Sequence, residues 1–286
     1  MLYFDRVCTV IILGAHTINI ENCRIQFEII KSKKAKENSA KVEIFNLLPK
    51  TRKLISEQEG LVKVFAGYNC AEGLIEIGQG DISKVKNNCD KTNVVTEIYM
   101  SEGLLKIKNN PLSISFSSNS KVDLEAITRS MQSLTGGQLV FRYVDIDTSK
   151  TIDNGYSDMG SIDQILTNLG IQFGFEWSFQ NGIVILKGTK KSKAKETLLL
   201  TPKNGLILNP ETVRHVSRRI SKSKIVNQDK NTKSIQSLLQ PNLQINDIIA
   251  VESKDLTGRY QIEKIIHRGD THGNDWYSDM EVVSIN

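Results

Sequence analysis

Four side chains of types that bind metals or transfer protons gather near the end of the chain, in the run HRGDTHGNDW. They are His267, Asp270, His272 and Asp275. Imidazole and carboxylate groups at such spacing can bind a divalent metal or act as acid and base, so a metal-dependent hydrolase is one hypothesis. The flanking runs are strand-like, however, and the glycines and asparagine among these residues are typical of a long hairpin tip. We therefore favour a structural tip without catalysis, and expect alanine at His267, Asp270 and His272 to leave the fold intact.

A second candidate site is the basic run RHVSRRISKSK. Its cations are Arg214, Arg218, Arg219, Lys222 and Lys224. If the run is helical, the three arginines share one face, and each phosphate that they neutralise adds salt-dependent affinity for nucleic acid. Few aromatic side chains that could stack on bases lie nearby, and no helix-turn-helix or RNA-binding motif accompanies the run. A solvated or partner-facing segment is the favoured interpretation, and a nucleic-acid-binding β protein using residues 214–224 is the alternative.

Other patterns that carry catalysis are absent from the sequence. There is no G-x-S-x-G motif, and the glycines of IGQGD lack the lysine and the helix that a phosphate-binding loop needs. The four cysteines, Cys8, Cys23, Cys70 and Cys89, include no C-x-x-C pair, so we expect free thiols in a reducing compartment and no zinc site. The net charge of +5 selects no function by itself. We expect a protein that is not an enzyme and needs no cofactor or metal.

The elements that position these residues are predicted to be mostly strands. Residues 2–100 contain the strand-like runs VCTVIIL, CRIQFEII, AKVEIFNL, GLVKVFAGY, LIEIGQGDISKV and NVVTEIYM. Their spacing is typical of a sandwich or a small barrel. One short helix is predicted in PKTRKLISEQEG, where Pro49 suits the first helical position and Gly60 suits the end. The apolar N-terminal run is too short to span a bilayer, so we expect a soluble product without a membrane anchor, made in the cytoplasm.

The middle of the chain changes to a helical period. In SKVDLEAITRSMQSLTGG the apolar residues Leu124, Ile127, Met131 and Leu134 recur at three and four, and a second short helix is predicted in SIDQILTNLG. The run FEWSFQNGIVILKG predicts a hairpin, because the pair Asn181–Gly182 supplies the positive φ angles of a tight turn. The polar run TKKSKAKE then closes a small α/β module as a linker.

After residue 197 the sequence returns to strand-like runs, and their order resembles that of the first segment. The succession GLVKVFAG, LIEIGQGDISKV, polar tip and NVVTEIYM matches DIIAVESK, RYQIEKIIHRGD, polar tip and YSDMEVVS. Two similar all-β units that flank a different insert are therefore predicted.

This succession resembles the baseplate hub proteins of tailed bacteriophages, a family shared with contractile injection machines. The likeness rests on NSAKVEIFNLLPKTRKLI and the strands after it, on SIDQILTNLGIQFGFEWSFQNGIVILKG in the middle, and on NGLILNPE through GRYQIEKIIHRGDTHGNDWYSDMEV at the end. It implies a mainly β (α+β) fold, with two related tube-type β-barrel domains at 1–105 and 197–286 flanking a small α/β domain at 106–196.

The resemblance also implies a structural role in the virion. Three chains with two similar domains apiece would form a ring that adapts a sixfold tail tube to a threefold central spike. The implied partners are two further copies of the chain, tail-tube or tube-initiator proteins and the spike, with the tape measure protein and baseplate wedge proteins as further contacts. The implied location is the tail baseplate of a particle assembled in a bacterial host.

Overall fold

The computed structural model describes residues 5–33, 38–69, 73–90, 92–101, 111–180, 182–188, 196–221, 224–254 and 256–285, without the side chains of residues 90, 196–197 and 208–231. The chain forms two compact units. The first combines both flanking segments, Met1–Lys33, Glu37–Met100 and Ala194–Asn286, and the second contains the middle segment, Ser101–Lys193. Within the described ranges, no helix is long and apolar enough to cross a membrane.

The fold is mainly β, as expected, and the first β segment contains all of the strands predicted for it. Its elements are β1 (Arg6–Gly14), β2 (Thr17–Ile20), β3 (Ile25–Ser32), β4 (Ser39–Phe45), α1 (Pro49–Glu57), β5 (Gly60–Tyr68), β6 (Gly73–Asp90) and β7 (Asn93–Ser101). Pro49 begins α1 as predicted, but the helix ends at Glu57 and Gly60 opens β5 instead. Gly60 is needed for another reason: a Cβ there would lie 2.6 Å from the carbonyl oxygen of Leu13 on the paired strand β1.

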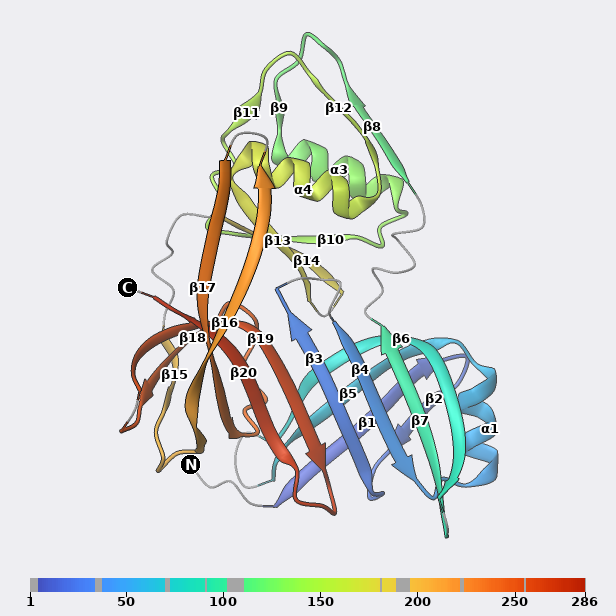
Figure 1. The fold of residues 1–286 in the computed structure, drawn as a ribbon. Coiled ribbons are helices and arrows are strands. Elements are labelled where there is room, and N and C mark those ends of the chain that lie inside the picture. Colours follow the sequence, from blue (N-terminus) through green and yellow to red (C-terminus); the bar gives the residue numbers. More distant parts are fainter. Residues whose placement is uncertain are drawn as a thin grey trace. The chain divides into compact units, whose positions relative to one another are not determined.

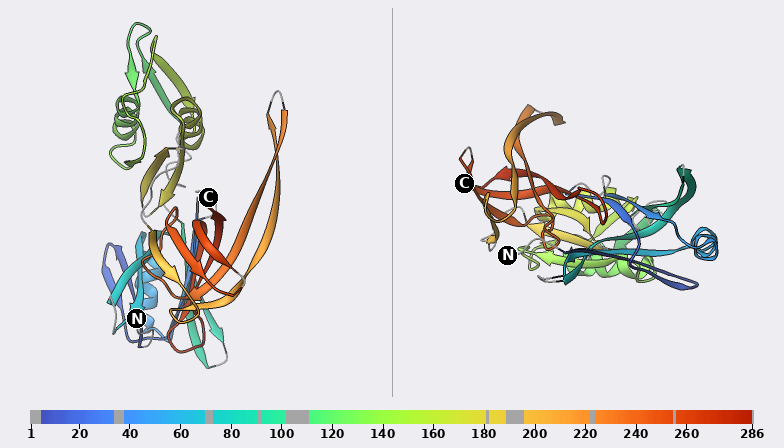
Figure 2. Two further views of the ribbon diagram at one scale, coloured as in Figure 1. Left: turned by 90° about the vertical axis from the view of Figure 1, so that its left-hand side faces the viewer. Right: turned by 90° about the horizontal axis from the view of Figure 1, so that it is seen from below.

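The last β segment also follows the predicted strands. Its elements are β15 (Glu196–Leu200), β16 (Leu206–Ser221), β17 (Lys224–Leu238), β18 (Ile248–Glu252), β19 (Thr257–Asp270) and β20 (Trp276–Ser284). The strands β16 and β17 form a long hairpin that extends beyond the other strands of its unit (Figures 1 and 2).

The two β segments share one sheet of 13 strands among the described residues. Its order is β16-β17-β20-β19-β3-β4-β7-β6-β5-β1-β2, and β18 pairs with β19 and β15 at the side. The segments meet where β19 pairs with β3 in antiparallel fashion (Figure 1). The barrel closure expected of each segment stays a prediction.

The two segments have the same internal strand order. In the first, the order is β3-β4-β7-β6-β5, and in the last it is β16-β17-β20-β19-β18, with each strand in the same sequential place. The likeness has limits: α1 lies between β4 and β5, whereas turns occupy residues 239–247 in the last segment. The next strand also differs in direction, since β1 is antiparallel to β5 and β15 is parallel to β18.

The second unit is a small α/β module built from short strands and two helices. Its elements are β8 (Leu112–Phe116), β9 (Val122–Asp123), α3 (Leu124–Leu134), β10 (Val140–Val144), β11 (Thr151–Ile152), β12 (Tyr156–Gly160), α4 (Ile162–Phe173), β13 (Phe175–Gln180) and β14 (Ile183–Gly188). The helix α3 packs on β8 and β9, and α4 packs on β12 and β13 (Figure 1).

Both predicted helices of this unit are confirmed, with one error in the apolar face. Leu124, Ile127 and Met131 are fully buried, whereas Leu134 is 53% exposed. Leu134 is the last residue of α3, just before the turn through Gly136 and Gly137, so no turn of the helix follows to cover it. The predicted hairpin forms between β13 and β14, and Gly182 has φ 78°. Asn181 lies outside the described residues.

Candidate functional site

The candidate site is the junction of the two β segments, which we call the β19–β3 junction. Seven residue pairs form its ladder, from Lys264 opposite Ser32 to Asp270 opposite Gln26. Because a backbone ladder satisfies the donors and acceptors of both edges, it joins the segments as one sheet. The side chains that gather here come from residues more than two hundred positions apart in the sequence.

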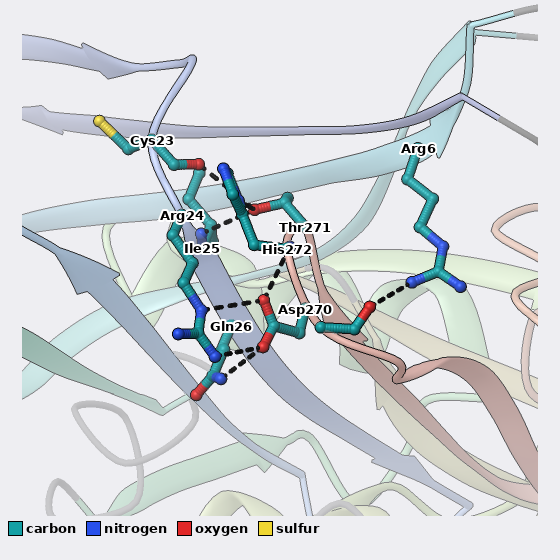
Figure 3. Close-up of polar contacts among 9 residues, drawn as sticks. Arg6, Cys23, Arg24, Ile25, Gln26, Asp270, Thr271 and His272 are labelled. Carbon is teal, nitrogen blue, oxygen red and sulfur yellow. Dashed lines mark hydrogen bonds and ion pairs between the residues drawn. The ribbon is translucent and has the colours of Figure 1, made fainter.

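Asp270 anchors the polar part of the junction at the end of β19 (Figure 3). Its Oδ2 accepts a hydrogen bond from Arg24 Nη2 at 2.8 Å and another from Gln26 Nε2 at 2.6 Å. Its Oδ1 accepts one from Arg24 Nε at 3.3 Å and one from the backbone N–H of His272 at 2.9 Å. Burial alone would raise the pKa of Asp270, but these hydrogen bonds outweigh it and lower the pKa to about 2.

The loop after Asp270 binds the start of β3 and the start of β1. Thr271 donates its backbone N–H to the carbonyl of Ile25 at 3.0 Å, and its hydroxyl accepts the N–H of Ile25 at 3.0 Å (Figure 3). Arg6 Nη1 donates to the carbonyl of Gly273 at 2.8 Å. The loop is therefore a docking element between the two segments as well as a hairpin tip.

An aromatic cluster forms the apolar part of the junction. Trp276 is fully buried, and it belongs to the core of the first segment although it begins β20. Its ring meets that of Phe27 edge-on at 5.4 Å between centroids, and Arg6 lies 5.6 Å from its ring centroid. Gly269 sits between these rings in the ladder, opposite both Phe27 and Trp276. A Cβ at Gly269 would lie 2.3 Å from Phe27 Cζ, so only glycine leaves room for the ring.

His267 is buried inside the same part of β19. Its Nδ1 and the hydroxyl of Ser278 lie 2.9 Å apart, and Nε2 has no hydrogen-bond partner among the described atoms. Burial, helped by the positive charge of Lys31, lowers the pKa of His267 to about 3. The ring is therefore neutral at pH 7 and acts as a packed core side chain.

A pocket of about 350 Å³ opens on the surface of the junction. Its lining includes Glu28, Lys41, Glu43, Arg268 and Asp270. Arg268 on β19 bridges Glu28 on β3 at 2.9 Å, and Lys41 pairs with Glu43 within β4. Arg268 also bridges Asp279 on β20 at 3.1 Å. The pocket is thus bordered by ion pairs that join strands of both segments.

The four residues singled out near the C-terminus are not brought together as one site. Extended positions alternate between the two faces of a sheet, so His267 and Asp270 lie on opposite faces of β19. Over the ranges that the structure describes, no group of three or more His, Cys, Asp or Glu side chains could hold a metal ion. The predicted hairpin tip is confirmed, since the residues between Asp270 and Trp276 connect β19 to β20. Alanine at His267, Asp270 and His272 is no longer expected to be harmless, because two of the three are buried and bonded across strands.

The basic run lies in the β16–β17 hairpin. Arg214, Arg218 and Arg219 are in β16 and Lys224 begins β17, so a helical face for the arginines is wrong. Lys222 lies outside the described residues, as do the other four side chains. Nucleic-acid binding through this run stays a prediction.

Arg6, Arg24, Gln26 and Phe27 are functional residues of the junction that sequence reasoning missed. Each partner lies in the last segment, and nothing local marks the pairing. One signal was present: Arg24 and Gln26 lie two positions apart at the start of a strand, a spacing that puts two polar side chains on the same face.

Known structures share this fold over nearly the whole chain. A 43 kDa tail protein of prophage MuSo2 from Shewanella oneidensis matches with 12% identity and a TM-score of 0.66, covering 96% of each chain. The tail protein from Neisseria meningitidis MC58 matches with 8% identity and a TM-score of 0.67, covering 98% of this chain and 97% of that one. The E. coli c3393 protein, a type VI secretion component described as similar to the T4 tail proteins gp27 and gp5, matches with 10% identity and a TM-score of 0.57, covering 99% and 74%.

By sequence, no protein-family model and no curated protein matches the chain. The likeness therefore lies in the fold, and at that level it confirms the resemblance to phage tail and injection-machine proteins.

Proposed function

We propose that this chain is the structural hub of a phage tail or a related injection machine. Three copies form a ring at the tail tip, and each contributes two similar β segments. The ring then presents six similar units to a sixfold tail tube and threefold symmetry to a central spike. The tube or tube-initiator proteins and the spike are the proposed partners, with the tape measure and wedge proteins around them.

The observation that carries this proposal is the matched strand order of the two segments together with the way they join. The first strand of one segment, β3, pairs with the fourth strand in the order of the other, β19. The contact uses the first strand in one order and the fourth strand in the other. The fourth strand of the first segment, β6, and the first strand of the last segment, β16, are therefore left for the same contact with another chain. A repeated contact between unlike edges builds either a ring or an open filament, and the ring results when the rotation closes.

The fold comparisons support the same function. Two of the similar structures are described as tail proteins and one as a component of a type VI secretion system, and all three extend over nearly the whole chain. The junction supports a structural role as well, because its ionised and aromatic groups are engaged in holding strands of both segments together.

Labelling of intact tails tests the proposed location. An antibody raised against the chain is expected to mark one end of the tail, where a hub lies, and quantitative mass spectrometry of purified tails is expected to give three copies per particle. Labelling along the tube, or a copy number that is not a multiple of three, would contradict the proposal. A salt-sensitive complex of the purified chain with random DNA would favour the nucleic-acid-binding alternative.

A further inference from the structure

The ring proposed above requires a second junction, between one chain and the next. We propose that the distal half of β6 in one copy pairs with the outer edge of β16 in the neighbouring copy, as an antiparallel ladder equivalent to the β19–β3 junction. This inference rests on the proposed function and names the surfaces that close the ring.

The strand β6 is the counterpart of β19 in the first segment. Each is the fourth strand of its segment's order and each forms a hairpin with the next strand. The first half of β19, through Gln261, pairs with β18, and its second half pairs with β3. In the same way the first half of β6, through Asp81, pairs with β5. The remaining residues of β6, 82–90, have no second strand beside them within the described part of the chain.

The strand β16 is the counterpart of β3. Each opens a hairpin and stands first in its segment's order. The outer edge of β3 is covered by β19, whereas β16 is the terminal strand of the described sheet and pairs only with β17. Unpaired edges of this length invite addition of another strand. The other two strands at ends of the described sheet, β2 and β15, have no counterpart in the β19–β3 junction, so they are not the edges that the repeat selects.

Equivalent positions fix the expected register on the β6 side. Gln261 pairs with the first residue of β18, and Asp81 pairs with the second residue of β5. When Gln261 and Asp81 are equated, both strands end at matching positions, Asp270 and Asp90. Arg268 then corresponds to Asn88.

The register on the β16 side follows from the neighbouring strands. Asn46 donates its backbone N–H to Val94 at the start of β7, and Leu238 pairs with Tyr277 at the start of β20. Asn46 and Leu238 thus occupy equivalent positions, because each contacts the second residue of the neighbouring strand. Seven positions earlier in each segment, Ser39 is equivalent to residue 231. Because Ser39 pairs with Ile30 and residue 231 pairs with Arg214, Glu28 corresponds to Thr212.

The pair Arg268 and Glu28 is directly opposite in the β19–β3 junction, so Asn88 of one chain is expected opposite Thr212 of the next. The same register sets Lys86 opposite Arg214, and two like charges directly opposite each other are a local cost of this pairing. Directly opposed positions in an antiparallel ladder have Cα atoms about 4.5–5.5 Å apart, within the range that a disulfide spans.

Cysteine crosslinking tests the pairing on the full chain in assembled tails. Cys89 is exposed and adjacent to the test position, so every variant carries Cys89→Ser. The test variant combines Asn88→Cys with Thr212→Cys, and the matched control combines Asn88→Cys with Val213→Cys, which is one position out of the expected register. After mild oxidation, the test variant is expected to form covalent dimers and trimers on a non-reducing gel, and the control is expected to remain mostly single chains.

Each outcome separates this inference from the function on which it rests. Crosslinking at Val213 in place of Thr212 would overturn the register, and crosslinking at neither position in tails that hold three copies would overturn the pairing of these edges. A copy number other than three would count against the hub itself. Hydrogen exchange gives an independent readout: residues 84–90 and 210–216 are expected to gain protection when the isolated chain enters the ring, and no gain in either would contradict the inference.

Discussion

At the scale of single residues, the junction depends on a glycine that makes room for two aromatic rings. Gly269 lies opposite Phe27 and Trp276 in two neighbouring ladders, and the Phe27 ring covers the place where a side chain would begin. Aromatic side chains bury large areas and prefer the edge-on contact that Phe27 and Trp276 make. A small residue is therefore as necessary here as the large ones.

Gly269→Ala is expected to lower the free energy of unfolding by about 1–3 kcal/mol, since the added methyl overpacks a filled site. Chemical denaturation of the purified chain measures this loss. The double variant Gly269→Ala with Phe27→Leu should lose less than the sum of the two single changes, because a shorter side chain at Phe27 relieves the clash. Strict additivity of the two changes would show that the ring and the methyl do not compete.

The Asp270 carboxylate makes the junction sensitive to acid. Its pKa in the folded chain is about 2, below the ordinary value of 3.8. A depressed pKa contributes stability that is fully present above the ordinary value and is lost as pH falls from about 4 toward 2. The difference in unfolding free energy between the wild type and Asp270→Asn is expected to shrink across this window.

Urea unfolding of both proteins at a series of pH values measures that difference. Glu57→Gln is the control, because Glu57 is exposed, and its ion pair with Lys53, at 3.8 Å, is of the kind that contributes little to stability at pH 7. If the difference in unfolding free energy between the wild type and Asp270→Asn stays constant from pH 5 to pH 2, Asp270 does not cause the acid sensitivity.

At the scale of elements, the β13–β14 hairpin depends on the backbone freedom of one turn residue. Gly182 has φ 78°, a left-handed conformation that a β-branched residue adopts only with strain. Gly182→Val is expected to cost about 1 kcal/mol or more in unfolding free energy, and Gly182→Asn much less, because asparagine tolerates this conformation. Thermal unfolding checks both variants, and equal melting temperatures for valine and asparagine would contradict the turn argument.

Most elements could be predicted from the sequence because their signals are local. Runs of β-branched and other apolar residues mark β1, β5 and β7, the period of Leu124, Ile127 and Met131 marks α3, and Pro49 marks the start of α1. The strand β2 was missed, since TINI is only four residues long and follows β1 almost directly. The prediction that Gly60 ends the helix is wrong. A glycine that ends a helix and a glycine that lets two backbones approach closely cannot be told apart from the sequence.

The contacts of the candidate site could not be predicted, because they are not local. The tip after β19 has the composition of an ordinary turn, yet Asp270, Thr271 and Trp276 bind residues at the start of the chain. The glycines, asparagine and aspartates of this tip predict the turn correctly, but they do not reveal its partners. The ladder between β19 and β3, which gives those residues their partners, has no local signal in the sequence.

At the scale of the whole molecule, the two β segments behave as variants of one plan. Each has the same five-strand order, and one edge of each is used in the contact between them. Within the described sheet, repetition of this contact would use β6 of one chain and β16 of the next. Covering both edges by ring formation would also remove a hazard of aggregation, since exposed strand edges pair readily with other chains.

The most direct test of the hub is a cryo-electron microscopy structure of the assembled tail tip. We expect three copies of this chain around a central channel, with their first and last β segments alternating in one ring between the tube and the spike. A symmetry other than threefold for this chain, or a ring from which one of the two β segments is excluded, would contradict it.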